Sequence, residues 1–129
     1  MITTAIVQHW SGSDHAEELL PISTAPELEA AIRRLSDAES ATLTLEAADK
    51  SLLIAASKGD YCATAILGFD DLFDMVGDAA QSGTIGFVQG GQEVDLPRTQ
   101  LLTVEQAIAA AKEFFETGGV NVERHWQKQ

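Results

Sequence analysis

The chain has 129 residues, 20 of them acidic and 8 basic, and its formal charge at pH 7 is -12. This length suits a single domain spanning residues 1–129, whose core is large enough to need no disulfide or metal. The negative charge opposes binding to nucleic acid or anionic lipid, and no uncharged apolar segment is long enough to cross a bilayer. Any large partner is therefore expected to be a basic protein.

Cysteine content and the first residues indicate a reducing, cytoplasmic compartment. The single cysteine, Cys62, has no second cysteine with which to form an internal disulfide. The start Met-Ile-Thr-Thr-Ala also lacks the positive end and long apolar run of a signal peptide.

The first third of the chain predicts a strand, a loop and a helix. Residues 2–9 are rich in β-branched side chains and predict a strand that leads into a polar turn at 11–14. Residues 14–23 are acidic and irregular, and predict a loop. Thr24 opens a capping box, so a helix is expected to begin here and to end near Asp37. Its apolar stripe consists of Leu28, Ala31, Ile32 and Leu35.

After this helix the apolar period changes to two, which predicts an antiparallel meander of three strands. The turns are expected at residues 49–50 and 58–59. With two-residue loops at both places, Leu45 would face Ile54 and Ile54 would face Ala63. All three side chains would then lie on one face of the sheet.

A second hairpin is centred on Gly90-Gly91. This turn pairs Phe87 with Val94 and Ile85 with Leu96, again on a single face. The two registers together predict one sheet. Between the hairpins, residues 70–80 fit either a short helix or a strand.

The last elements are a helix and a strand. Thr103 and Gln106 have the spacing of a capping box, and Gly118 is suited to end the helix that follows. Residues 120–122 are expected to restart the chain as a strand that runs to Trp126. The apolar stripe of the helix consists of Val104, Ala107, Ile108, Ala111, Phe114 and Phe115.

The second half of the chain resembles immunity protein family one of bacterial polymorphic toxin systems. The similarity is carried by the run Phe114-Phe115-Glu116-Thr117-Gly118, which is followed by Trp126-Gln127. Further landmarks precede it in order: Val76-Gly77-Asp78, Gly83, Gly86-Phe87, Gly90-Gly91 and Pro97. The resemblance implies a small antidote that binds a toxin made by the same cell, often a deaminase-type toxin that acts on nucleic acid. It also favours a strand for residues 70–80.

The expected fold is an α+β sandwich of two layers. An antiparallel sheet of about six or seven strands would carry the two amphipathic helices on one face.

No pattern in the sequence indicates catalysis or a bound cofactor. The histidines and Cys62 lack the local spacings of zinc sites, and neither a phosphate loop nor a nucleophile elbow is present. As a catalytic pair, Asp70 and Asp74 would need a buried pocket, of which the sequence gives no sign. We therefore expect a protein that is not an enzyme and holds no cofactor or metal.

The acidic residues are the unusual feature. Residues 59–97 contain no Lys or Arg but seven acids, and four of these are the candidate partner-binding residues: Asp70, Asp71, Asp74 and Asp78. Asp74 and Asp78 would project together from one strand or one helix that contained both. Such a segment is either an ordinary solvated face or a recognition surface for a basic toxin.

Trp10 is the remaining candidate for partner contact, since Trp is enriched at binding hot spots. His9-Trp10 and His125-Trp126 would form a shared aromatic patch if the first and last strands were neighbours.

The sequence thus leads to an immunity protein that binds a cognate toxin domain and occludes its active site. The alternative is a small cytoplasmic enzyme or ligand-binding module, whose site would lie between the sheet and the helices.

Overall fold

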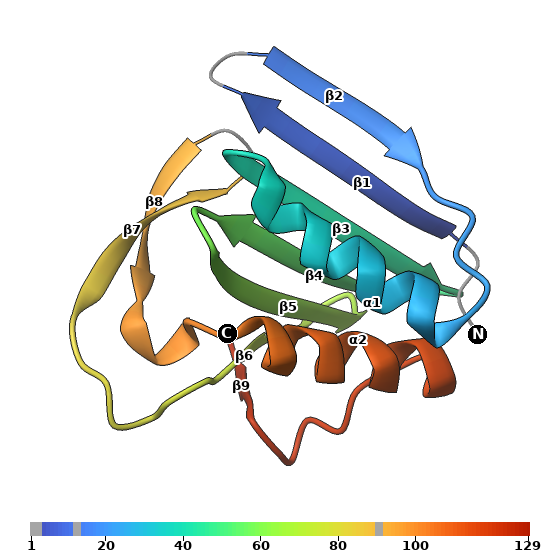
Figure 1. Cartoon of the computed structure of the whole chain (residues 1–129). Helices are drawn as coiled ribbons and strands as arrows, with labels where there is room; N and C mark the ends of the chain where they lie inside the picture. The colour runs from blue at the N-terminus through green and yellow to red at the C-terminus, as the bar shows by residue number, and fades with distance from the viewer. Residues whose placement is uncertain (1–3, 12–13, 90–91) are drawn as a thin grey trace.

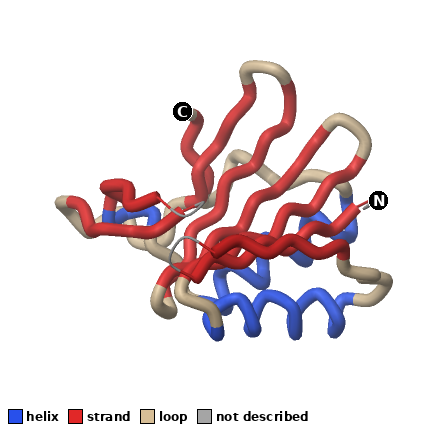
Figure 2. The backbone as a smooth tube through the Cα atoms, turned by 90° about the horizontal axis from the view of Figure 1, so that it is seen from above, coloured by secondary structure: helices blue, strands red, loops and turns tan. Residues whose placement is uncertain are grey.

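The protein is described by a computed structural model that covers residues 4–11, 14–89 and 92–129. It has an α+β fold in which a seven-stranded antiparallel sheet carries two helices on one face (Figures 1 and 2). In spatial order the strands of this main sheet are β2 (Asp14–Leu19), β1 (Thr4–Ser11), β3 (Ser40–Ala47), β4 (Lys50–Ser57), β5 (Asp60–Gly68), β6 (Asp71–Met75) and β9 (Trp126–Lys128). The predicted fold class is confirmed.

Two helices and a small second sheet complete the described fold. The helices are α1 (Ala25–Arg34) and α2 (Val104–Thr117), and the second sheet pairs β7 (Thr84–Gln89) with β8 (Gln92–Pro97). Short 3-10 turns, η1 (Leu35–Asp37) and η2 (Arg98–Gln100), follow α1 and β8. Neither described helix is both long and apolar enough to span a bilayer.

Local sequence signals fix both helix starts. The Thr103 side chain accepts a hydrogen bond from the Gln106 N–H at 3.2 Å, and Gln106 Oε1 accepts one from the Thr103 N–H at 2.9 Å, so the predicted capping box is present. Gly118 ends α2 at a φ of 76°, which glycine adopts without strain. At α1, the Thr24 side chain accepts from the Glu27 N–H. The Thr24 hydroxyl also donates to the Glu27 carboxylate and makes the largest contribution to its lowered pKa.

The core fills the space between the helices and the main sheet. Its fully buried members include Leu28, Ile32, Leu43, Leu45, Leu52, Ile54, Ala65 and Phe114. Phe115 is only partly buried, so the two adjacent rings of α2 differ in their packing. The Tyr61 hydroxyl donates to the Ile32 carbonyl oxygen at 2.8 Å, and this buried bond connects β5 to α1.

The meander confirms one predicted pairing and corrects another. Ile54 pairs with Ala63 as predicted. Leu45 pairs with Leu52 rather than Ile54, because the turn begins at Ala48, one residue earlier than predicted. The resulting shift of two residues leaves every side chain on its predicted face, since side chains alternate with a period of two.

The second hairpin has the predicted register but a different location. Phe87 pairs with Val94 and Ile85 with Leu96. These strands form a separate sheet, so the prediction that both hairpins belong to one sheet is wrong. Its expected turn at Gly90-Gly91 lies outside the described residues, as does part of the turn expected at 11–14.

Two terminal strands also differ from the prediction. Residues 14–19 form β2 at one edge of the main sheet rather than a loop. An edge strand accommodates acidic side chains because they remain in water there. At the other edge, the last strand is β9, which begins at Trp126 instead of ending there, and residues 120–122 are not in a strand.

The order of the strands separates the two His-Trp dipeptides. Trp10 lies on β1, next to the β2 edge, whereas Trp126 lies on β9 at the opposite edge. The first and last strands are therefore not neighbours, and the condition for a shared aromatic patch is not met. The ambiguous segment 70–80 contains strand β6, as the resemblance implied, and this strand ends at Met75.

Candidate partner-binding surface

The side of the main sheet opposite the helices is called the open face here. One row of directly paired residues crosses this face through all seven strands: Leu19, Ile6, Thr44, Leu53, Thr64, Asp74 and Gln127. A second row beside it pairs Glu46 with Ser51, Ser51 with Ile66 and Ile66 with Leu72. These rows combine aliphatic side chains with hydroxyls and carboxylates, a composition suited to contact with a protein.

The small sheet covers one end of the open face. Ser40 Oγ donates to the Val88 carbonyl oxygen at 3.0 Å, and the Val88 N–H donates to Ser57 Oγ at 3.2 Å. Beneath this contact lies a second buried apolar cluster of Ala55, Cys62, Phe87 and Leu96. The two rows above lie farther along the strands, beyond the residues that pack under the hairpin.

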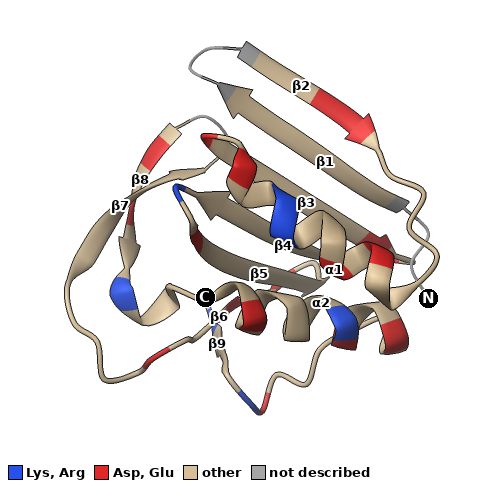
Figure 3. Cartoon of the chain, in the orientation of Figure 1, with Lys and Arg blue, Asp and Glu red and all other residues tan. Residues whose placement is uncertain are grey.

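The basic residues of the described strands and helices lie on the helix side of the main sheet, where they are mixed with acids such as Glu29 and Glu105. Strand alternation places Glu17, Glu46 and Asp74 on the open face, whereas Lys50 and Lys128, the two lysines within described strands, point to the helix side. Both helices carry basic residues on that side as well (Figure 3). The described strands therefore add no Lys or Arg to the open face.

Asp74 is held in place at the β6 end of the open face. Its carboxylate accepts hydrogen bonds from Thr64 Oγ1 at 2.9 Å and from Gln129 Nε2 at 3.0 and 3.1 Å. Both carboxylate oxygens thus accept a hydrogen bond, and the residue is half-buried. Two uncharged donors orient Asp74 without neutralising it.

Asp70 and Asp71 lie at the tip of the β5–β6 hairpin. Asp71 forms an ion pair with Lys128 of β9, with 3.3 Å between Oδ1 and Nζ. The Asp71 side chain also packs against Gly68, because a Cβ added at Gly68 would lie 3.0 Å from Asp71 Oδ2. Asp70 is exposed beside it, and the described residues form no ion pair with Asp70. The tip therefore adds a carboxylate at the end of the open face.

Asp78 lies apart from Asp74. Because β6 ends at Met75, no single strand or helix contains both residues, and periodicity does not align them. The Asp78 carboxylate accepts from the Ala80 N–H at 2.9 Å and from Gln81 Nε2 at 3.3 Å. These bonds, that from Ala80 first, lower the pKa of Asp78, so it is ionised at neutral pH.

Trp10 lies on the open face near the opposite edge. Its ring stacks on that of His15, the directly paired residue of β2, with 4.9 Å between centroids. Trp10 is half-buried and borders a shallow cavity that Ala38 and Glu39 also line. About four strand spacings, or roughly 19 Å, separate β1 from β6. Trp10 and Asp74 thus share one face at its two ends.

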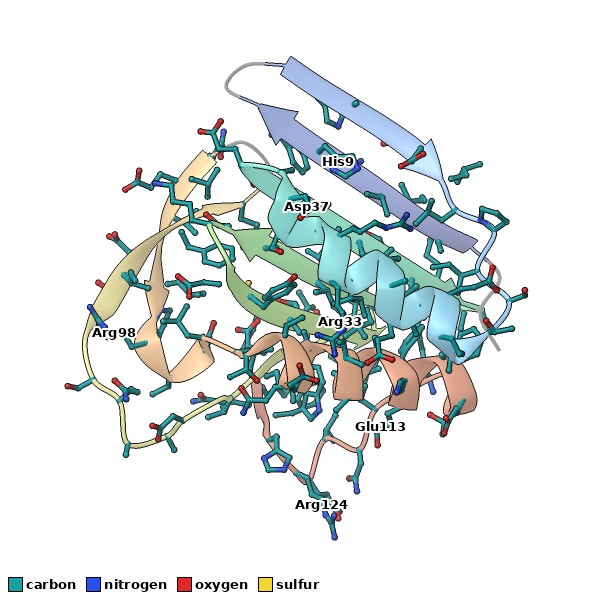
Figure 4. The ribbon with its side chains drawn as sticks, viewed as in Figure 1. His9, Arg33, Asp37, Arg98, Glu113 and Arg124 are labelled. Atoms are coloured by element: carbon teal, nitrogen blue, oxygen red, sulfur yellow. The ribbon has the colours of Figure 1, made fainter. Side chains whose placement is uncertain are left out.

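A cavity lies on the helix side, between β1, β2 and the end of α1. Its volume is about 420 Å³, and its apolar floor includes Val7 and Leu35. Its rim has mixed charge, with His9 and Asp37 (both labelled in Figure 4) and Arg34. This cavity differs from the open face, because its rim carries cationic as well as anionic side chains.

Reactive groups are scarce in the described residues. Cys62 is buried under the small sheet, and burial raises the pKa of its thiol to about 12, so the nucleophilic thiolate is not formed at neutral pH. The described residues contain no group of three or more His, Cys, Asp or Glu side chains placed to hold a metal ion.

The comparisons with known proteins identify the family. The family model of immunity protein Imm1 matches residues 16–128, which is nearly the whole chain. The chain belongs to this family. A search of curated proteins finds no match. Membership in the Imm1 family supports the role of an immunity protein, which binds a cognate toxin, over that of a metabolic enzyme.

One exposed residue of the hairpin tip received no role from the sequence. Phe69, between Gly68 and Asp70, is 97% exposed. The sequence did contain a signal, since an aromatic residue between a glycine and two aspartates stands in a turn composition.

Proposed function

We propose that this Imm1 protein neutralises a toxin domain that acts on nucleic acid, such as a deaminase, by occupying its substrate groove. It acts in the cytoplasm as a binding protein without turnover. The proposed contact residues are Asp70, Asp71, Asp74, Asp78 and Trp10.

Charge complementarity is the observation that supports this proposal. A toxin domain that holds a phosphate backbone needs a basic groove. The immunity protein has a charge of -12, and its described open-face strands present carboxylates without Lys or Arg. An acidic surface of this kind matches such a groove, accelerates encounter and excludes the competing nucleic acid.

The first experiment combines the protein with the toxin domain encoded in the adjacent reading frame. We expect the two to co-purify, and we expect stoichiometric immunity protein to abolish the toxin's activity on nucleic acid in vitro. The immunity protein alone should show no hydrolase or transferase activity. A toxin that stays fully active beside excess immunity protein would contradict the proposal.

The second experiment separates local charge from net charge. The double variant Asp70→Asn with Asp74→Asn removes two negative charges at the proposed surface, and the amide introduced by Asp74→Asn keeps an oxygen to accept the Thr64 hydrogen bond. The matched control is Glu116→Gln with Glu123→Gln, which removes the same amount of charge. Both side chains are exposed, Glu116 in the last turn of α2 and Glu123 in the segment after it.

Association of the Asp variant with the toxin domain should be slower and less dependent on salt than that of the wild type, because screening acts on the charges that steer encounter. The control should associate at nearly the wild-type rate. Equal effects of the two variants would show that only net charge matters and would remove the Asp residues from the interface.

A further inference from the structure

The β5–β6 hairpin tip presents an aromatic side chain almost entirely to water. Phe69 is 97% exposed, compared with 70% for Leu19, 39% for Val94 and 36% for Ile66, the other large exposed hydrophobic residues described. A phenylalanine in this state contributes almost no burial to the fold. Exposed aromatic residues of this kind are a recurring feature of binding anchors.

The tip is continuous with the open face. Ile66 and Leu72 pair directly, and only the Gly68–Asp71 pair separates them from the turn that carries Phe69. Both side chains lie on the open face, in the row that begins at Glu46. Phe69 therefore lies close along the chain to an aliphatic part of the open face, and Asp70 and Asp71 follow it directly in sequence.

The shape of the tip is fixed by the chain itself. The register shifts between Ile66 and Gly68, which is an irregularity of the kind that bends a hairpin. The Asp71 side chain occupies the space that a side chain at Gly68 would need, and Lys128 pairs with Asp71 from the neighbouring strand. A tip held in this way costs little to order when a partner binds.

We propose that Phe69 is the anchor of the toxin interface, inserting into an apolar pocket that the toxin domain borders with Lys or Arg. This inference rests on the proposed function. Asp70, which is exposed and forms no ion pair with the described residues, supplies the charge complementarity that selects a basic partner. A second copy of the same chain is disfavoured as the occupant, because two tips in contact would bring their aspartates together.

The decisive variant is Phe69→Ala, measured with the purified toxin domain. The dissociation constant should increase at least about thirty-fold, which is the loss that a hot-spot aromatic produces. The thermal unfolding midpoint should stay at the wild-type value, since the ring is exposed. Phe69→Leu should recover part of the affinity, because it restores an apolar side chain at the tip.

Val94→Ala is the matched control. It also truncates an exposed apolar side chain, but on β8 of the small sheet, and the dissociation constant should remain within about two-fold of the wild type. Light scattering of the free proteins tests whether a second copy of the chain binds the tip instead. The wild type is expected to have the same molecular mass as Phe69→Ala.

Each result decides between the two proposals. Wild-type affinity in Phe69→Ala would overturn the anchor while leaving the immunity function intact. A wild-type dimer that Phe69→Ala converts to a monomer of unchanged toxin affinity would assign the tip to self-association instead. Failure of the wild type to bind the toxin domain would overturn the proposed function, and the anchor with it.

Discussion

Replacing Phe114 with alanine is expected to be among the most damaging single changes in α2. The ring is 0% exposed and packs between α2 and the main sheet. Its removal loses the transfer free energy of the ring and leaves a cavity, which together cost about 3 to 5 kcal/mol. A domain of this size has a free energy of unfolding of about 5 to 15 kcal/mol, so the variant should lose about a fifth of it or more. The unfolding midpoint should fall by about 10 to 20 °C.

Urea and thermal unfolding, followed by circular dichroism, measure the effect. Phe115→Ala should be clearly milder because that ring is only partly buried, and Glu116→Ala should change the free energy of unfolding by less than about 0.5 kcal/mol because the side chain is exposed. The order Phe114, Phe115, Glu116 is thus expected. If Phe114→Ala unfolds like Glu116→Ala, the placement of α2 on the sheet is wrong.

Three further changes probe other parts of the fold. Thr103→Ala removes the side chain that accepts from the Gln106 N–H, and should cost about 1 kcal/mol in urea melts; an unchanged midpoint would mean that the cap contributes nothing. Gly77→Ala should cost about 1 to 3 kcal/mol, because its Cβ would lie 2.0 Å from the Leu101 carbonyl oxygen and the backbone must move; wild-type stability would show that the contact is not present. The thiol of Cys62 has its pKa raised to about 12 by burial, compared with about 8.5 in an unfolded chain, so this group favours folding below about pH 8.5 and loses that contribution as the pH rises toward 12. Between about pH 8.5 and 12, the free energy of unfolding of Cys62→Ala should therefore fall less than that of the wild type. Parallel plots of unfolding free energy against pH for the two proteins would contradict the raised thiol pKa.

The helices could be predicted from the sequence because their signals are local. A capping box involves residues three apart, and the apolar stripe of α2 repeats within one helix. The same is true of the Phe87–Val94 pairing, which needs only its own hairpin. Nothing local, however, says which sheet a hairpin joins. That is decided by the packing of Phe87 and Leu96 against residues of β4 and β5.

The first meander turn shows a different limit. The structure places Ala48 at a φ of 56°, a left-handed conformation that costs a residue with a Cβ about 1 to 2 kcal/mol. Sequence rules place the turn at Asp49 and Lys50, because alanine rarely adopts a left-handed conformation and so is not expected to begin a turn of this kind. The long paired strands β3 and β4 compensate for this cost, and their length is a property of the whole sheet.

The candidate surface could be predicted only as a set of acidic residues. The sequence singled out Asp74, but its hydrogen bond to Thr64 depends on the register of the β5–β6 hairpin, and its bonds to Gln129 depend on a residue 55 positions away in the chain. The separation of Asp78 from Asp74 follows from where β6 ends, and element boundaries are weakly encoded. The exposure of Phe69 is also a property of the folded chain, since most phenylalanines are buried.

The small sheet has a consequence for the kinetics of the folded protein. Its described attachment consists of the hydrogen bonds of the Ser40 and Ser57 side chains to the Val88 backbone and a cluster of four buried residues, whereas the main sheet and helices share a much larger core. The hairpin is therefore the unit expected to open first, well below the energy of global unfolding. Each opening uncovers Cys62, whose rate of modification by a thiol reagent, divided by the rate for an unprotected thiol, gives the equilibrium constant for that opening.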